Sequence, residues 1–251
     1  ASLVYTFRHL EGHALLPSEV NYRGIMYAMK TLGVEAVIGV SAVRSRLRDI
    51  TPGTLVAVEQ YIDRTYGRAK TFYGNGIAAR VSLGQPVCQN VRRQLIEAGE
   101  ALGNEIVSGR EVATLMVMEG PATSTQAEAE IGRRQAPLIG TTSMPEAALA
   151  REAELCYCTL AGVTEYDSCY PQIPAPTASE ASRISNEMRE KIGSLVVATA
   201  KRFLALENYQ CSDRTALDDA IRTNPKMIPR WRIDEQSHLL ARWSQKNQSN
   251  K

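Results

Sequence analysis

The sequence Val34-Glu35-Ala36-Val37-Ile38-Gly39-Val40 is a short apolar run rich in β-branched side chains. Three similar runs follow it along the chain, over residues 54–58, 114–118 and 156–163. Runs of this length and composition are typical of strands that are buried on both faces of a sheet. The four runs therefore predict strands of one central sheet.

Helical patterns separate these runs. The first predicted helix begins at Ser18, a residue type that caps helix N-termini, and ends at Gly33. Others are predicted over residues 90–102, from residue 143 onward and over 179–206, where apolar side chains recur at helical spacing. The alternation predicts an α/β fold, with a single domain over residues 1–223 and a mixed, largely parallel central sheet flanked by helices.

The residues from 224 to 251 are more polar than the rest of the chain. We expect them to form a C-terminal polar tail that is docked on the domain through Trp231 and Trp243. The residues from 245 onward are expected to fray, as chain ends do when nothing holds them.

The composition excludes several classes of protein. The chain has 251 residues, of which 44% are hydrophobic and 22% charged, and this is enough apolar material for a packed core. The net charge is only +2 and both signs are mixed along the chain, so no surface for nucleic acid or for an anionic membrane is expected. No apolar run approaches the roughly 18 residues that cross a bilayer, and no signal peptide is visible.

The five cysteines indicate an intracellular, reducing environment. Their number is odd and three of them lie in strand-like sequence, which is typical of reduced core thiols. Cys156 and Cys158 have neither a second cysteine pair nor a histidine near them in the sequence. We therefore expect no metal site and no cofactor.

Polar residues follow the predicted strands. Ser41-Ala42, Glu119-Gly120-Pro121 and Glu165-Tyr166-Asp167 each stand where a run ends or shortly after, and Thr141-Thr142 is a fourth polar segment. In open α/β folds the chemistry is placed at the carboxyl ends of the strands. The sequence therefore predicts that these four segments meet in one site.

The same segments, together with several others, follow the pattern of a known family. The others are Arg8-His9 with His13, and residues 17–23, 52–56, 60–65, 124–128 and 145–153. In this order the chain resembles the methylthioadenosine phosphorylase branch of the purine nucleoside phosphorylases, from about Phe7 to about Cys169. The resemblance implies phosphorolysis, in which phosphate attacks the anomeric carbon of a nucleoside through an oxocarbenium-like transition state and the purine leaves. It also implies a cytoplasmic homo-oligomer, commonly a trimer.

The resemblance implies a role for each matching residue. The residues that would bind phosphate are Arg8, His9, Ser41, Ala42 and Thr142. The sugar would be bordered by His13 and Thr141, and the purine by Thr123, Ser124 and Glu165. Asp167 would be the catalytic acid at the leaving base. The residues alone also allow a structural role for His13 and a turn or cap role for Asp167.

Several positions depart from the family's pattern. Val43 and Arg44 stand where the family has a small residue and a glycine, and residues 44–48 are expected to form a solvated or partner-facing basic loop. Thr123 replaces the phenylalanine that stacks on the purine, a contact that contributes about 1–3 kcal/mol. Glu165 replaces an aspartate. The family's first strand and glycine-rich phosphate loop have no counterpart, because the sequence begins after them.

Three functions fit this pattern. Because the changes fall in all three sub-sites, we favour a catalytically impaired relative that serves as a structural or interaction subunit of a larger assembly, in the cytoplasm or in mitochondria. The alternative is an active phosphorylase that cleaves methylthioadenosine or another purine nucleoside with phosphate. The third hypothesis is a nucleoside-binding sensor without turnover.

Overall fold

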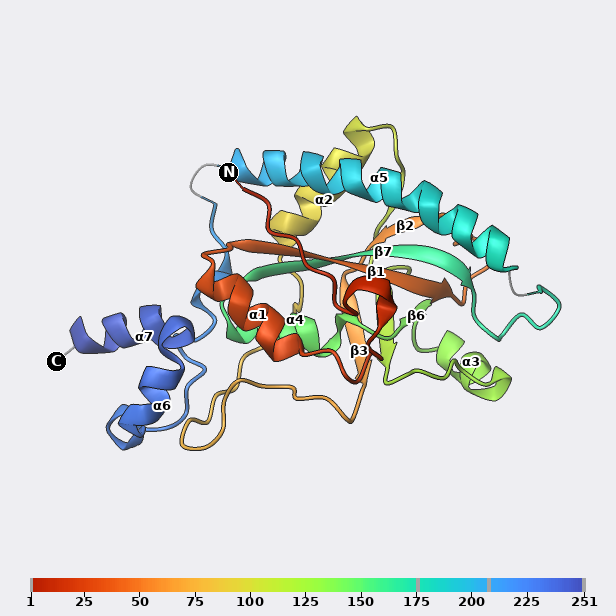
Figure 1. Ribbon diagram of the computed structural model, residues 1–251. Coiled ribbons are helices and arrows are strands. Elements are labelled where there is room, and N and C mark those ends of the chain that lie inside the picture. The colour runs from red at the N-terminus through yellow and green to blue at the C-terminus, as the bar shows by residue number, and fades with distance from the viewer. Residues whose placement is uncertain (1, 175–176, 207–208, 250–251) are drawn as a thin grey trace.

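The computed structural model describes residues 2–174, 177–206 and 209–249. Seven strands in these ranges form one sheet in the order β3-β5-β6-β1-β7-β2-β4 (Figure 1). The strands are β1 (Ala36–Ser45), β2 (Leu55–Ala57), β3 (Gln60–Arg64), β4 (Ile106–Val107), β5 (Thr114–Met118), β6 (Leu138–Gly140) and β7 (Cys156–Tyr166). The pairs β1–β7, β2–β4, β3–β5 and β5–β6 are parallel, whereas β1–β6 and β2–β7 are antiparallel. The prediction of a mixed, largely parallel sheet is confirmed.

The two central strands are longer than their apolar runs. β1 and β7 pair from Ala36↔Cys156 to Ser45↔Tyr166, with a shift of register between Val43 and Arg44. The shift places Arg44 opposite Glu165, so the two charges face each other at the end of the sheet. A charged side chain ends an apolar run but not a strand, because a cross-strand partner of opposite charge stabilises it there. The expected solvated loop at residues 44–48 is therefore wrong at its start, where Arg44 belongs to β1 and Arg46 is buried.

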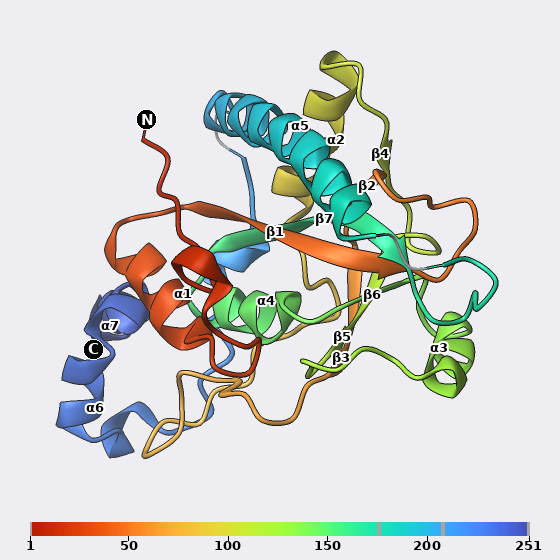
Figure 2. The same cartoon turned by 45° about the vertical axis from the view of Figure 1, so that its right-hand side comes forward.

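Helices cover both faces of the sheet. They are α1 (Tyr22–Thr31), α2 (Gln89–Ala101), α3 (Gln126–Arg133), α4 (Ser143–Glu152), α5 (Ala178–Leu204), α6 (Arg230–Glu235) and α7 (Ser237–Ser249), with 3₁₀ turns η1 (Glu11–His13), η2 (Ser212–Thr215) and η3 (Pro225–Met227). α2 and α5 pack together on one face, and α1 and α4 pack together on the other (Figure 2). α1 begins later than predicted, because Asn21 rather than Ser18 caps it by accepting from the N–H of Gly24.

Strand β7 divides the core between these two layers. Successive side chains of a strand point to opposite faces. Tyr157 and Ala161 belong to the apolar cluster under α1 and α4, whereas Cys156 and Leu160 belong to the cluster under α2 and α5. β7 is buried from Cys156 to Val163, as its continuous apolar run predicts.

The C-terminal segment folds as η3, α6 and α7 beside α1 (Figure 1). Trp243 is buried in a third apolar cluster with Tyr73, Ile77 and Leu240, whereas Trp231 is exposed. The division of the chain at residue 223 stays a prediction. No helix within the described ranges is both long enough and apolar enough to span a bilayer.

Candidate active site

Three hydroxyl groups meet where β1 approaches the start of α4. The Ser41 Oγ lies 2.9 Å from the Thr142 Oγ1 and 3.1 Å from the Ser143 Oγ. All three side chains are buried. Two hydrogen bonds join three O–H groups, so one O–H of the cluster is left to donate to a ligand. The structure thus brings together Ser41 and Thr142, two residues predicted to bind phosphate, and adds Ser143.

Arg8 reaches the same end of the sheet from the N-terminal segment. Its Nε and Nη2 donate to the carboxylate of Glu146 in α4, with the shortest contact 2.6 Å, and its Nη1 donates to the carbonyl of Val40 at 2.6 Å. Although burial opposes the charged form, the Glu146 carboxylate raises the pKa of Arg8 above its ordinary value. Two of the five guanidinium N–H groups remain for an anion.

The sequence pattern did not single out the partners of Arg8 as site residues. Glu146 is buried and also accepts from the Tyr157 hydroxyl at 3.0 Å. Gly39 in β1 leaves the space for this arrangement, because a Cβ there would lie 2.3 Å from the Tyr157 Oη and 2.9 Å from the Arg8 Nη2. In the sequence, the only indication of this contact was a glycine within an apolar strand, which often marks a place where another group lies close to the backbone.

His9 and His13 form a stacked pair. Their rings lie 4.2 Å apart, and the His9 Nδ1 donates to the carbonyl of Leu15 at 2.7 Å. Burial, followed by repulsion from His13 and Arg8, lowers the pKa of His9 below its ordinary value. His13 has a φ of 58°, in the left-handed region that few non-glycine residues adopt. The bond to Leu15 and the stacked ring of His13 therefore orient the His9 imidazole.

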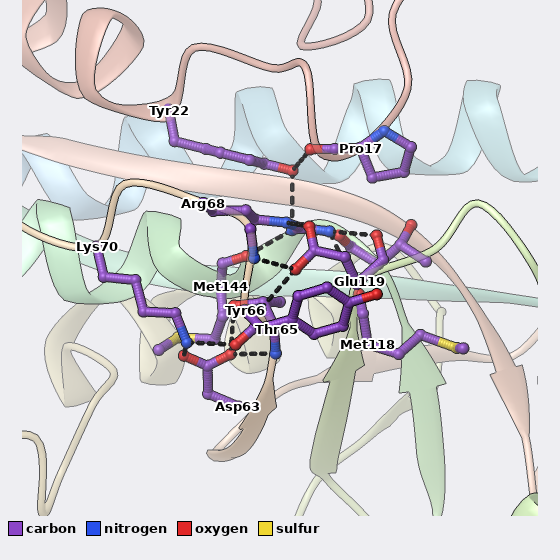
Figure 3. A network of polar contacts seen from close by, with 12 residues as sticks. Pro17, Tyr22, Asp63, Thr65, Tyr66, Arg68, Lys70, Met118, Glu119 and Met144 are labelled. Carbon is purple, nitrogen blue, oxygen red and sulfur yellow. Dashed lines mark hydrogen bonds and ion pairs between the residues drawn. The ribbon is translucent and has the colours of Figure 1, made fainter.

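Arg68 joins several loops through a network of polar contacts (Figure 3). The guanidinium is buried and donates to the Glu119 carboxylate at 2.9 Å, to the Thr141 carbonyl at 2.6 Å and to the Met144 carbonyl at 2.7 Å. Glu119 also accepts from two backbone N–H groups, those of residues 66 and 67. Despite partial burial, these bonds hold the pKa of Glu119 below its ordinary value. The sequence pattern gave no sign of Arg68, because a lone arginine in a loop is usually solvated.

Two arginines of β1 and its extension bind the two carboxylates predicted for the purine. The Arg44 Nε donates to Glu165 at 2.8 Å, and the Arg46 Nε donates to the Asp167 Oδ2 at 2.7 Å. The Arg46–Asp167 pair is almost fully buried, whereas the side chains of Arg44 and Glu165 are 24% and 30% exposed. The Asp167 Oδ1 has no hydrogen-bond partner among the described residues, and Arg44 Nη1 lies 3.9 Å from it.

The remaining predicted residues are Ala42, Thr123, Ser124 and Thr141. Thr123 and Ala42 are exposed, and Thr141 is half-buried against Gly120. Ser124 is buried, and its carbonyl accepts from the Ser168 hydroxyl at 2.9 Å.

The chain has known relatives. A family model described as the phosphorylase superfamily matches residues 7–202, which span every predicted site residue. The chain belongs to the phosphorylase superfamily. Phosphorylases of this family named S-methyl-5′-thioadenosine phosphorylase include one from Bradyrhizobium diazoefficiens, 41% identical over 89% of this chain and 77% of the relative. Another, from Chloroflexus aurantiacus, is 43% identical over 88% of this chain and 76% of the relative.

Solved phosphorylase structures agree with these relatives. The crystal structure of a methylthioadenosine phosphorylase from an antarctic soil metagenomic library matches with a TM-score of 0.86 at 37% identity. The match covers 93% of this chain and 81% of that protein. A variant of adenosine/methylthioadenosine phosphorylase from Schistosoma mansoni, in complex with methylthioadenosine, matches with a TM-score of 0.74 at 26% identity, over 80% of this chain and 75% of that protein.

The prediction of a catalytically impaired structural subunit is wrong. That prediction was based on individual altered side chains. Relatives that are 41% and 43% identical over nearly nine tenths of the chain are named as phosphorylases, and this overturns it. These relatives favour the alternative hypothesis, in which the chain is a phosphorylase.

Proposed function

We propose that the protein cleaves 5′-methylthioadenosine with phosphate and releases adenine and the sugar 1-phosphate. The observation that carries the proposal is the gathering of the matching residues along one strand end. Ser41 of β1 contacts Thr142, and Arg44, three residues further, contacts Glu165 and lies near Asp167. The names of the relatives support the choice of nucleoside.

At the phosphate end, the hydroxyl of Ser41 or of its neighbour Thr142 donates to a phosphate oxygen. Arg8 supplies its two remaining N–H groups and a positive charge, and the stacked His9 completes the cradle. Charge-assisted bonds of this kind are the stronger class of hydrogen bond. They hold the phosphate close to the anomeric carbon of the bound nucleoside, so that its attack becomes an effectively unimolecular step.

At the purine end, Asp167 acts on the leaving base. Arg46 donates to Oδ2, so Oδ1 is the oxygen left to act on the purine. Proton donation to the leaving group offsets the negative charge that develops on the base as the bond breaks. Because Asp167 is buried, water is excluded from its carboxylate.

Arg44 must release Glu165 before a purine contacts that carboxylate. Both side chains are partly exposed, and such pairs contribute about 1 kcal/mol or less. Breaking the Arg44–Glu165 pair therefore costs little free energy, whereas the buried Arg46–Asp167 pair stays in place.

The direct test measures adenine released from 5′-methylthioadenosine with and without phosphate. Release that requires phosphate supports the proposal, whereas binding without release would indicate a nucleoside sensor instead.

Ser41→Ala should raise the KM for phosphate about tenfold, from the loss of a hydrogen bond to a charged group. Asp167→Asn should lower kcat by roughly 100-fold or more, from the loss of the general acid. Glu128→Gln, in the exposed cap of α3, is the matched control and should change neither.

We also propose that the protein forms a homo-oligomer, the state implied by its family. The N-terminal segment supports a contact between subunits, because three of its apolar side chains are exposed: Leu3, Tyr5 and Phe7. Sedimentation of the purified protein tests this assembly. The compartment stays a prediction.

A further inference from the structure

A cluster of four ligand-type side chains lies at the opposite end of β7 from the phosphate residues. It consists of Cys88 before α2, Cys156 at the start of β7, and Cys211 and Asp213 around η2. One ligand atom of each side chain lies within 4.8 Å of the corresponding atoms of the other three. The Cys211 Sγ is 3.2 Å from the Cys156 Sγ and 3.5 Å from the Cys88 Sγ. Residues from three distant parts of the chain thus converge on one point.

We propose that these four side chains bind a single Zn²⁺ ion with three sulfur ligands and one carboxylate oxygen. Zinc is bound tetrahedrally at about 2.3 Å from sulfur, which places neighbouring sulfurs roughly 3.8 Å apart. The Cys156–Cys211 and Cys88–Cys211 separations need to open by about 0.6 and 0.3 Å to meet this geometry. Three soft thiolates with one carboxylate favour zinc over the hard cations magnesium and calcium.

The backbone around the cluster is fixed by hydrogen bonds. The N–H of Cys88 donates to the carbonyl of Tyr157 at 2.7 Å, which ties Cys88 beside the neighbouring Cys156. The N–H of Cys156 donates to the carbonyl of Glu35 at 3.1 Å, and the carbonyl of Cys211 accepts from the N–H of Arg214 at 3.2 Å. Cys88, Cys156 and Asp213 are buried. A ligand set held in this way loses little conformational entropy when a metal binds.

A second layer of contacts orients the carboxylate ligand. Arg151 lies 2.8 Å from Asp213 and donates to the carbonyls of Ser82 and Gln85 at 2.9 and 2.7 Å. Partners of this kind orient metal ligands and influence affinity. The positive charge of Arg151 also offsets part of the excess negative charge that three thiolates and a carboxylate bring to Zn²⁺.

The cluster has a path to solvent. A cavity of about 530 Å³ is bordered by Cys211 and Asp213, and by polar residues that include Gln85, Asn90 and Ser212. A hydrated ion can enter there and exchange its waters for the side chains. Once bound, it joins η2, and with it the connection from α5 to the C-terminal helices, to the edge of the core.

The experiment is metal analysis of the full chain purified from zinc-containing medium, followed by titration with Co²⁺ after removal of zinc. We expect about one zinc per chain and, with Co²⁺, the intense thiolate-to-cobalt absorption of a tetrahedral site. Cys211→Ser should lose the bound zinc, and Asp213→Asn should weaken its binding by at least the roughly 10–100-fold that loss of an outer-shell partner costs. Cys169→Ser removes a buried thiol from a separate cluster and should retain the metal.

Two results would overturn the proposal. One is a chain that holds no metal above background although it is folded and its thiols are reduced. The other is a mass lower by two hydrogens with loss of the Cys156 and Cys211 thiols, which would identify a disulfide instead. The Co²⁺ spectrum of the unaltered chain tests the site even if a cysteine variant fails to fold. None of these measurements uses phosphorolysis, so they stand or fail separately from the proposed activity.

Discussion

At the scale of single residues, Arg44 is the change with the clearest chemical consequence. Its Nε donates at 2.8 Å to Glu165, one of the residues predicted to contact the purine. Arg44→Ala should free Glu165 for the substrate. Because a partly exposed ion pair contributes about 1 kcal/mol, we expect the KM for the nucleoside to fall roughly fivefold in steady-state assays.

The matched control for this change is Arg48→Ala. Arg48 is exposed and lies 5.4 Å above the ring of Tyr170, away from both carboxylates, so its removal should leave the KM unchanged. A rise in KM for Arg44→Ala would mean that the guanidinium holds the substrate rather than competing with it.

His9 gives the site a defined response to pH. Burial, with repulsion from His13 and Arg8, lowers the pKa of His9 below its ordinary value of 6.5. Below pH 6.5 the unfolded chain therefore takes up a proton before the folded chain does, and the contribution of His9 to stability falls as pH decreases. A bound phosphate should favour the protonated imidazole and raise this pKa.

This prediction is checked by nuclear magnetic resonance titration of the three histidines with and without phosphate. The resonance of His9 should shift to a higher midpoint when phosphate is added, while that of His238, on α7 beside Tyr27, should not. Equal midpoints for His9 in both titrations would exclude it from the phosphate cradle.

At the scale of elements, Arg68 joins the loop after β3, the turn after β5 and the start of α4. Arg68→Met would leave the Glu119 carboxylate and the carbonyls of Thr141 and Met144 without their cationic donor. Removing one partner of a buried pair costs about 3–5 kcal/mol. We therefore expect the melting temperature to fall by roughly 10 °C for a chain of this size.

A matched control is available on the same loop. Lys70 pairs with Asp63 at 2.8 Å, but its side chain is 42% exposed, so Lys70→Met should lower the melting temperature by about 2 °C or less. The Arg68 variant should also lose activity, because the loop that carries Thr142 is no longer fixed. Equal melting temperatures for the two variants would show that the Arg68 network does not stabilise these loops.

At the scale of the whole molecule, the sequence predicts the scaffold better than the site. Apolar runs and helical spacing are local patterns, and they located the central strands and the helices between them. The site depends on pairs such as Arg8–Glu146 and Arg46–Asp167, whose members are 138 and 121 residues apart. Spacing in the sequence carries no information about such contacts, which form only when distant segments of the folded chain come together.

The same limit explains the error about function. Arg44 was counted as one of the altered positions when it was considered alone. In the folded chain, the shifted register places it against Glu165, while the hydroxyls of Ser41 and Thr142 remain together. The effect of a substitution depends on where the strand directs the new side chain, and the sequence alone does not give that direction.

The attachment of the C-terminal helices to the body of the enzyme can be tested through Arg242. Arg242 in α7 donates to Glu154 at 2.9 Å and also pairs with Asp218. The Glu154 side chain is 2% exposed and that of Arg242 is 36% exposed, so Arg242→Met should cost about 2 kcal/mol, less than for a fully buried pair. In a calorimetric scan this corresponds to a fall of roughly 4–8 °C. Arg230→Met removes an exposed pair with Asp234 in the same segment and should change the scan by about 2 °C or less. If both variants melt alike, the docking of α7 depends on the apolar contacts of Trp243 and Leu240 rather than on this buried carboxylate.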